Sequence, residues 1–243
     1  METRKLFVPL TLFLLLGLIA TVTFGCWNMP QERSTADYVK ENRNVGDFSR
    51  LEIGGAFKLY ISQGDKVSLT IEADQDDIKD IITEIEGNTL RIYPSRNWGN
   101  MFNDVTIWLT IKDLEYINFS GAVEVTGEGT LEFSEIDLEV SGAAEIRMNF
   151  NASKFDAEFS GASEVDLAGK STTGYIELSG ASEFDAQNLE FQDLNVDVSG
   201  ASSAKVWATG TLTIDASGAS DIRYKGSPKV SLDESGASTV KPM

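Results

Sequence analysis

The tripeptide Ser-Gly-Ala occurs seven times in the second half of this 243-residue chain, at nearly regular intervals. Successive serines are 18 to 21 residues apart and lie at Ser120, Ser141, Ser160, Ser179, Ser199, Ser217 and Ser235. A repeat of this length with little drift is typical of a solenoid, in which each repeat forms one coil stacked on the previous one. The repeat therefore constrains the architecture more than any other property of the sequence.

Apolar and polar residues alternate on both sides of each tripeptide. Three positions before the serine the chain has Ile117, Leu138, Ala157, Ile176, Val196, Ile214 and Leu232. Five positions after it the chain has Val125, Ile146, Val165, Phe184, Ala204, Ile222 and Val240. A period of two residues indicates strands with one buried and one solvated face, and the repeats lack the 3.6-residue apolar pattern that a helical solenoid needs.

The tripeptide itself is interpreted as the corner between two strands. Glycine permits a turn with positive φ, alanine is small enough for a crowded inner corner, and serine can bond nearby backbone or the serine one coil away. So few residues leave no room for helical crossovers between parallel strands. We therefore predict an all-β fold, a single-stranded parallel β-helix (β-solenoid) with coils of 18 to 21 residues.

The N-terminal segment has the features of an export signal. Arg4 and Lys5 precede an apolar run, so residues 1–25 are predicted to be a signal peptide. Cys26, the one cysteine, stands where a lipoprotein carries its lipid, and we expect lipidation there; ordinary cleavage beside an incidental cysteine and an uncleaved anchor are the alternatives. The polar residues 26–44 are predicted to be a tether, and residues 45–243 the β-helix domain.

The formal net charge of −18 limits the partners of the chain. Nucleic acid and acidic membrane surfaces would repel such a protein, so we expect no nucleic acid partner and contact with a membrane only through the lipid anchor. With a single cysteine, no intramolecular disulfide can form, and coil stacking must supply the stability.

Several sequence features together resemble one protein family. They are Asp47-Phe48, Leu51-Glu52-Ile53, residues 87–92 (Gly-Asn-Thr-Leu-Arg-Ile) and the serial Ser-Gly-Ala-Ser corners. Over residues 45–240 the chain resembles the "putative auto-transporter adhesin, head GIN domain" family of envelope proteins, common in Bacteroidetes-type bacteria. The resemblance implies a right-handed parallel β-helix and an adhesin-like role, and it brings no catalytic residues.

Two acidic columns run through the repeats. Two positions before the serine are Glu139, Glu158, Glu177, Asp197, Asp215 and Asp233, and four positions after it are Glu124, Glu145, Glu164, Glu183 and Asp221. Such rows could bind Ca²⁺ weakly. The calcium-binding glycine-aspartate nonapeptide is absent, however, so we favour a solvated acidic face, partly neutralised by Arg147, Lys205 and Arg223, and predict neither a metal site nor a cofactor.

Aromatic residues gather where the strand pattern breaks. Trp98 and Phe102, with Arg96 and Asn97, are the candidate binding residues, because aromatic rings can stack on sugars while polar neighbours bond hydroxyls. Tyr93, Trp108 and Tyr116 flank them. The alternative is that Trp98 and Phe102 fold back over an apolar coil as a lid.

The chain contains no histidine, which excludes Ser-His triads, histidine metal sites and histidine acid–base catalysis. Paired carboxylates could hydrolyse glycosides, but they need distinct environments, whereas these acids recur in equivalent contexts. We therefore expect a non-catalytic cell-envelope protein, an exported outer-membrane lipoprotein that binds an envelope or surface component, either a glycan or a protein. A polysaccharide-cleaving enzyme and a purely structural envelope protein are the alternatives.

Overall fold

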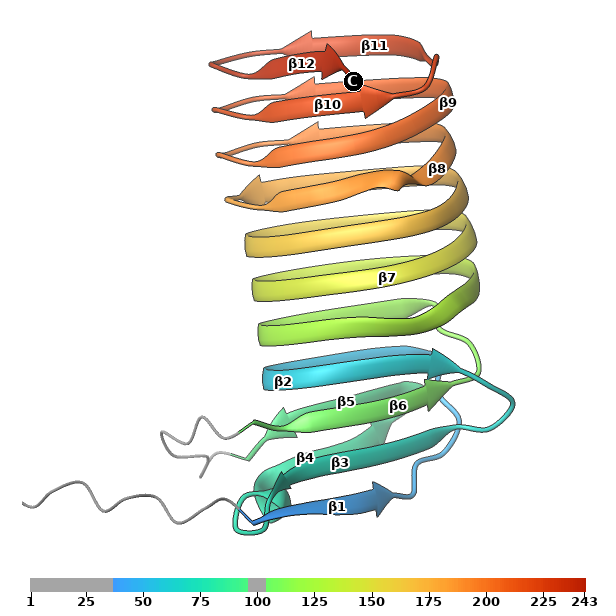
Figure 1. Ribbon diagram of the computed structural model, residues 1–243, viewed down its shortest axis with the longest axis vertical. Helices are drawn as coiled ribbons and strands as arrows, with labels where there is room; N and C mark the ends of the chain where they lie inside the picture. The colour runs from blue at the N-terminus through green and yellow to red at the C-terminus, as the bar shows by residue number, and fades with distance from the viewer. Residues whose placement is uncertain (1–36, 96–103) are drawn as a thin grey trace, which may run out of the picture. The chain divides into compact units, whose positions relative to one another are not determined.

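Strands account for most of the residues that the computed structural model describes, which are 37–95 and 104–243 (Figure 1). They are β1 (Tyr38–Arg43), β2 (Arg50–Gln63), β3 (Ser68–Asp74), β4 (Ile81–Glu86), β5 (Thr89–Pro94), β6 (Thr106–Ile111), β7 (Tyr116–Gly180), β8 (Glu183–Val198), β9 (Ser203–Ala216), β10 (Asp221–Lys225), β11 (Lys229–Glu234) and β12 (Thr239–Pro242). A short 3₁₀ turn, η1 (Ile78–Asp80), precedes β4. The prediction of an all-β fold is confirmed.

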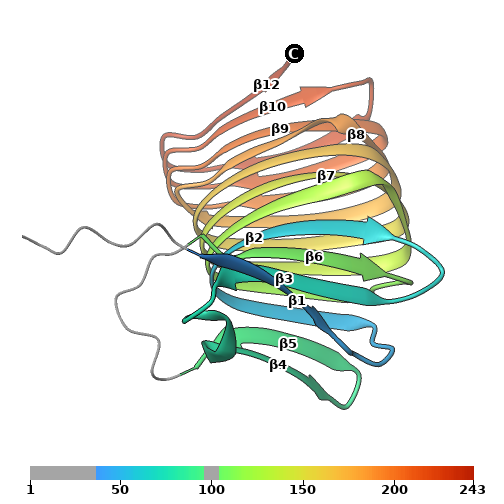
Figure 2. The ribbon, with the colours of Figure 1, turned by 60° about the horizontal axis from the view of Figure 1, so that its bottom comes forward.

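The strands form one mixed sheet of twelve strands, with β1-β3-β6-β2-β7-β8-β9-β10-β12 as its main path. Every pair that involves β2, β7, β8, β9 or β10 is parallel. The pairs β1–β3, β3–β6 and β4–β5 are antiparallel. Figures 1 and 2 show β7 winding through several successive coils, with β8 to β12 continuing the stack. The expected parallel pairing thus holds for the repeats, whereas the N-terminal strands are mixed.

The corner glycines lie above one another in a single file. All seven have positive φ, between +75° and +126°. A Cβ placed on any of them would collide with the carbonyl oxygen of the corner glycine one coil earlier. The file begins with Gly55, because Gly54, Gly55 and Ala56 pair with Ser120, Gly121 and Ala122. Glycine is therefore required at this position for two reasons: it adopts the positive φ, and it leaves room for the close approach of the adjacent coil.

The alanine of the tripeptide does not occupy a crowded inner corner, so that expectation was wrong. All seven alanines are exposed. The reason is parity: around the first corner the inward positions are Phe119 and Val123, and Ala122 between them points to solvent. Serine hydroxyls bond backbone carbonyls of the previous coil, as from Ser179 Oγ to Phe159 O at 3.3 Å.

The inward-facing residues form one continuous apolar core. The largest buried side chains are phenylalanines from successive coils, including Phe119, Phe150, Phe155, Phe159, Phe184 and Phe191. The rings of Phe150 and Phe155 are 4.9 Å apart and tilted by 57°. Aromatic burial of this kind, with tilted ring contacts, is a large contribution to coil stacking.

Part of the predicted tether is a strand. Residues Tyr38–Arg43 form β1, which pairs antiparallel with β3 along six positions. Val39 packs against the core, and Lys40 Nζ lies 4.1 Å from the centroid of the Trp108 ring. The folded region therefore begins earlier than residue 45, because backbone pairing and this cation–π contact hold a polar segment in place. Among the described residues, no helix is long and apolar enough to cross a membrane.

Candidate binding surfaces

The residues predicted to bind a ligand or a lipid lie outside the part of the chain that the structure describes. This applies to Cys26 and to Arg96, Asn97, Trp98 and Phe102. The described residues on either side of positions 96–103 lie near the corner at Gly55: Pro94 is next to Gly55, and Lys58 N donates to Val105 O at 2.9 Å. The role of the loop residues stays a prediction.

The remaining aromatics of the predicted cluster each have a different partner. Tyr93 Oη donates to Glu84 Oε1 at 2.6 Å, and Tyr116 Oη donates to Glu139 Oε2 at 2.6 Å. The guanidinium of Arg50 lies 3.8 Å from the centroid of the Tyr116 ring. The rings of Tyr93 and Tyr116 thus make contacts with other residues of the protein.

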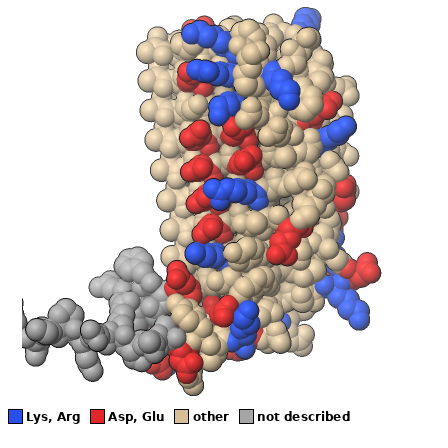
Figure 3. Space-filling view, in the orientation of Figure 1, with Lys and Arg blue, Asp and Glu red and all other residues tan. Residues whose placement is uncertain are grey.

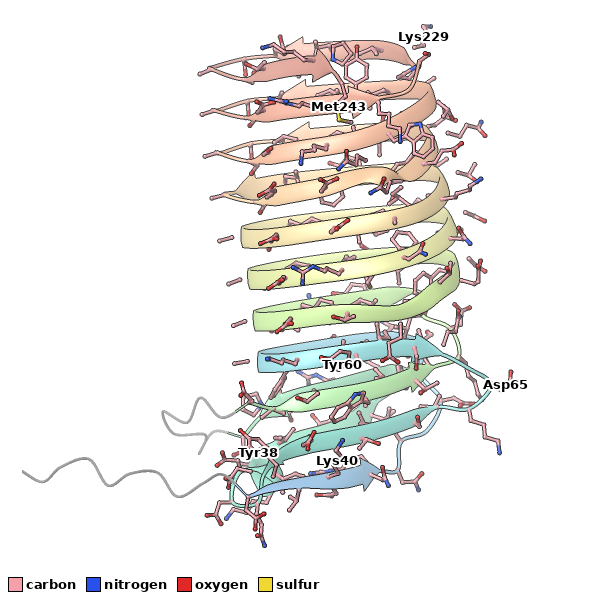
Figure 4. The ribbon with its side chains drawn as sticks, in the orientation of Figure 1. Tyr38, Lys40, Tyr60, Asp65, Lys229 and Met243 are labelled. Atoms are coloured by element: carbon pink, nitrogen blue, oxygen red, sulfur yellow. The ribbon has the colours of Figure 1, made fainter. Side chains whose placement is uncertain are left out.

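Trp108 belongs to an aromatic stack that sequence reasoning missed. Its ring lies 6.0 Å from that of Tyr60, with only 12° between the planes, and Lys40 caps it from β1. Figure 4 labels Lys40 and Tyr60 on this part of the molecule. The stack arises because β6 places Trp108 directly beside Tyr60 of β2. Only the strand order, which the sequence does not specify here, brings these residues together.

The first acidic column is a ladder of directly opposed carboxylates. Glu177, Asp197, Asp215 and Asp233 are register partners on successive strands. Burial, followed by the charges of Asp215 and Glu177, raises the pKa of Asp197. Rungs about 4.8 Å apart make such neighbours repel. The predicted column therefore exists, and its charges disfavour one another.

The predicted neutralising cations contact the acids unequally. Arg147 Nη2 forms an ion pair with Glu145 and lies 3.9 Å from Glu164, and Arg223 Nε lies 3.3 Å from Asp221. Both therefore neutralise the second acidic column, as expected. Lys205 instead pairs at 2.9 Å with Asp185, which belongs to neither column.

A groove of about 600 Å³ runs along the exit side of the corners. Exposed corner alanines form its floor, and the second acidic column borders it; the lining includes Ala56, Ala122, Ala143, Ala162, Ala181, Glu124, Glu145, Glu164 and Glu183. The groove was not predicted because the corner alanines were expected to point into the core. The repeated spacing of Ala and Glu was the available signal.

A second recess, of about 480 Å³, is more polar. Arg50, Lys154, Asp137 and Asp156 contribute to its lining. Burial is the main cause that raises the pKa of Asp137, with smaller contributions from Glu139 and Asp156. Near it, burial and the hydrogen bond to Glu139 raise the pKa of Tyr116 to about 12. Asp137 is thus a carboxyl group whose protonated form is favoured, beside a second carboxylate.

No group of three or more Asp, Glu or Cys residues within the described ranges is arranged to hold a metal ion. The surfaces found are an acidic ladder, an alanine-floored groove and a polar recess, all built from equivalent positions of stacked coils. They define the class of protein as an all-β repeat protein whose outward side chains form ladders.

The family model described as "Putative auto-transporter adhesin, head GIN domain" matches residues 47–228, and the chain belongs to this family. None of the curated proteins compared with the chain matches it.

Solved structures share the fold. A "putative adhesin" from Bacteroides fragilis is 22% identical, with a TM-score of 0.81 over 86% of this chain and 98% of that one. A second "putative adhesin", from Parabacteroides distasonis, is 20% identical with a TM-score of 0.69 over the same shares of the two chains. A "putative lipid binding protein" from the same species is 19% identical, with a TM-score of 0.67 and the same coverage.

Proposed function

We propose that this protein is a non-catalytic, adhesin-like binding module of the cell envelope, built on a right-handed parallel β-helix. Family membership is the observation that carries the proposal, because the family is described by an adhesin role. The architecture supports it: outward side chains recur at fixed spacing, which suits an extended ligand better than a small molecule. The partner is an envelope or surface component, a glycan or a protein.

The location follows from the N-terminal sequence. Residues 1–25 act as a signal peptide, and Cys26 carries the lipid that tethers the domain to the outer membrane. Expression of the full chain with a radiolabelled fatty acid tests this. Label should enter the wild-type protein and be absent from Cys26→Ala, and equal labelling of both would contradict the anchor.

Binding is tested with the full chain on an array of acidic and neutral glycans, while new reducing ends are measured in solution. Retention on particular glycans without new reducing ends supports the binding module. The double variant Trp98→Ala/Phe102→Ala should weaken retention if the loop carries the contact. If the wild-type protein is retained by no glycan and by no component of isolated envelopes, the purely structural alternative replaces the proposal.

The enzymatic alternative has one observation in its favour, the recess that holds Asp137. The pKa of Asp137 is raised by burial while Asp156 lies in the same recess, and a hydrolase with two carboxylates needs such an asymmetry. Release of reducing ends by the wild-type protein, lost in Asp137→Asn, would establish this alternative. We expect no release from either.

A further inference from the structure

Cations are stacked on one face of the last coils of this acidic chain. Lys205 of β9, Arg223 of β10 and Lys241 of β12 are direct register partners. Figure 3 shows Lys and Arg gathered over these strands, above coils where Asp and Glu predominate. We call these three residues, together with Lys225, the cationic ladder.

The cationic ladder is only partly neutralised. Lys205 pairs with Asp185 of the coil below at 2.9 Å, and Arg223 pairs with Asp221 at 3.3 Å. In the described part of the chain, neither Lys225 nor Lys241 forms an ion pair. Two of the four cations therefore have a carboxylate partner and two have none among the described residues. Like charges on rungs about 4.8 Å apart repel, so the ladder favours an anion that bridges them.

An aromatic ring lies beside the ladder. Trp207 is half-buried and is the register partner of Lys225, whose Nζ lies 3.9 Å from the centroid of the Trp207 ring. The same ammonium donates to Gln187 O at 3.3 Å. The positive surface ends one coil below, where Asp166 and Asp185 are opposed. A ligand of this surface must therefore span no more than these three coils in the stacking direction, or run across the coils at this position.

We infer that the cationic ladder binds a short segment of a linear polysaccharide with one carboxylate on each sugar, and that this segment lies along the stack over the last three coils. The cationic rungs are about 4.8 Å apart, so an oligosaccharide of a few sugars can reach all three. Arg223 can bind a carboxylate through two parallel hydrogen bonds, and the lysines supply point charges. This inference rests on the proposed binding function and names its ligand class.

Two other polyanions fit the surface less well. Nucleic acid and an extended anionic membrane would both face the acidic coils beside the ladder as well as the ladder itself, in a chain of net charge −18. An oligosaccharide segment no longer than these three coils faces the ladder alone.

Calorimetry with the full chain at low salt tests the inference, with a galacturonic acid hexamer as the probe. We expect saturable binding that the double variant Arg223→Gln/Lys241→Gln weakens by about tenfold or more. The matched control is Lys66→Gln/Lys79→Gln, which removes the same charge at two exposed residues of the N-terminal region and should change affinity less than about twofold. The fully methyl-esterified hexamer, which lacks the charges, should not bind. Melting curves establish that both variants fold.

Three outcomes would overturn the inference: no binding of the hexamer at millimolar concentration, equal losses in the two double variants, or equal binding of the esterified hexamer. The glycan array separates this failure from failure of the proposed function. Retention of the wild-type protein on other glycans or on envelope components, without binding of the hexamer, rejects the cationic ladder site alone.

Discussion

The repeated coils of residues 116–243 and the N-terminal strands of residues 38–111 are held in order by different means. In the repeats, each corner needs the same backbone conformation, which glycine supplies. Buried phenylalanines then pack against one another from coil to coil. In the N-terminal region, single side-chain contacts link neighbouring strands, as where Arg91 of β5 bonds Glu52 of β2 at 3.1 Å and Glu86 of β4 at 3.0 Å. The repeats are thus kept in order by one backbone conformation shared by all corners, whereas the N-terminal strands depend on specific polar contacts.

The largest effect should come from the core of the repeats. Phe155→Ala removes a buried ring that packs against Phe150 and Phe191, and we expect a loss of about 4 kcal/mol in the free energy of unfolding. Tyr175→Ala, at a side chain that is 41% exposed, should cost less than about 0.5 kcal/mol. Urea denaturation measures both. Similar losses in the two variants would mean that phenylalanine packing does not stabilise the coils.

The next test separates backbone conformation from close approach at the corner. Gly161→Ala places a methyl group against the carbonyl of Gly142 at φ +126°, and should cost about 3 kcal/mol. Gly129→Ala has φ +79° with open space around it, and should cost only about 1 kcal/mol. If urea denaturation shows equal losses of unfolding free energy in the two variants, the close approach of stacked glycines adds nothing to the cost of the positive φ.

A smaller effect is expected in the N-terminal region. Trp108→Ala removes the stack with Tyr60 and the cation–π contact with Lys40, which together contribute about 1–2 kcal/mol. Hydrogen exchange should show faster exchange of the β1 amides, with those of β8 unchanged. Thr110→Ala, two residues along the same strand, is the control. Protection of β1 that survives in Trp108→Ala would show that backbone pairing alone holds this strand.

The smallest effect concerns pH. Because the pKa of Asp197 is raised in the folded state above its ordinary value of 3.8, this group favours folding below that value and loses that contribution as pH rises through its folded pKa. Asp197→Asn should therefore raise the melting temperature slightly at pH 7 and low salt, with no gain near pH 3. Asp65→Asn, in an exposed loop, should have no effect at either pH. A gain that persists in 1 M salt would exclude charge repulsion as the cause.

Much of the repeated region could be predicted from sequence because its signals are local. The alternation predicted which residues are buried, except in the last coil, where Leu232 is 45% exposed because no further coil covers it, and the spacing predicted that the corners align. Gly54 and Gly55 pair with Ser120 and Gly121, so the file of corners extends one coil before the first Ser-Gly-Ala. The exposure of the alanines was missed, because residue size does not reveal on which side of a turn a Cβ points.

The N-terminal strands and the candidate sites depend on contacts between distant segments, which local patterns do not encode. Strand β1 is a polar segment that is ordered by β3 and Trp108, far along the chain. The cationic ladder arises only when Lys205, Arg223 and Lys241 are read across coils, where their 18-residue spacing becomes one vertical file. Read along the chain, these three residues form no basic cluster.

The stacked glycines also bear on how such a protein can change in length. Since each corner glycine lies against the corner glycines of the adjacent coils, a whole coil could be duplicated or lost between two corners while the remaining glycines find equivalent neighbours. A change of one residue would instead shift inward side chains to solvent. Variation among related proteins should therefore come in units of one coil, each adding about 4.8 Å to the length of the stack.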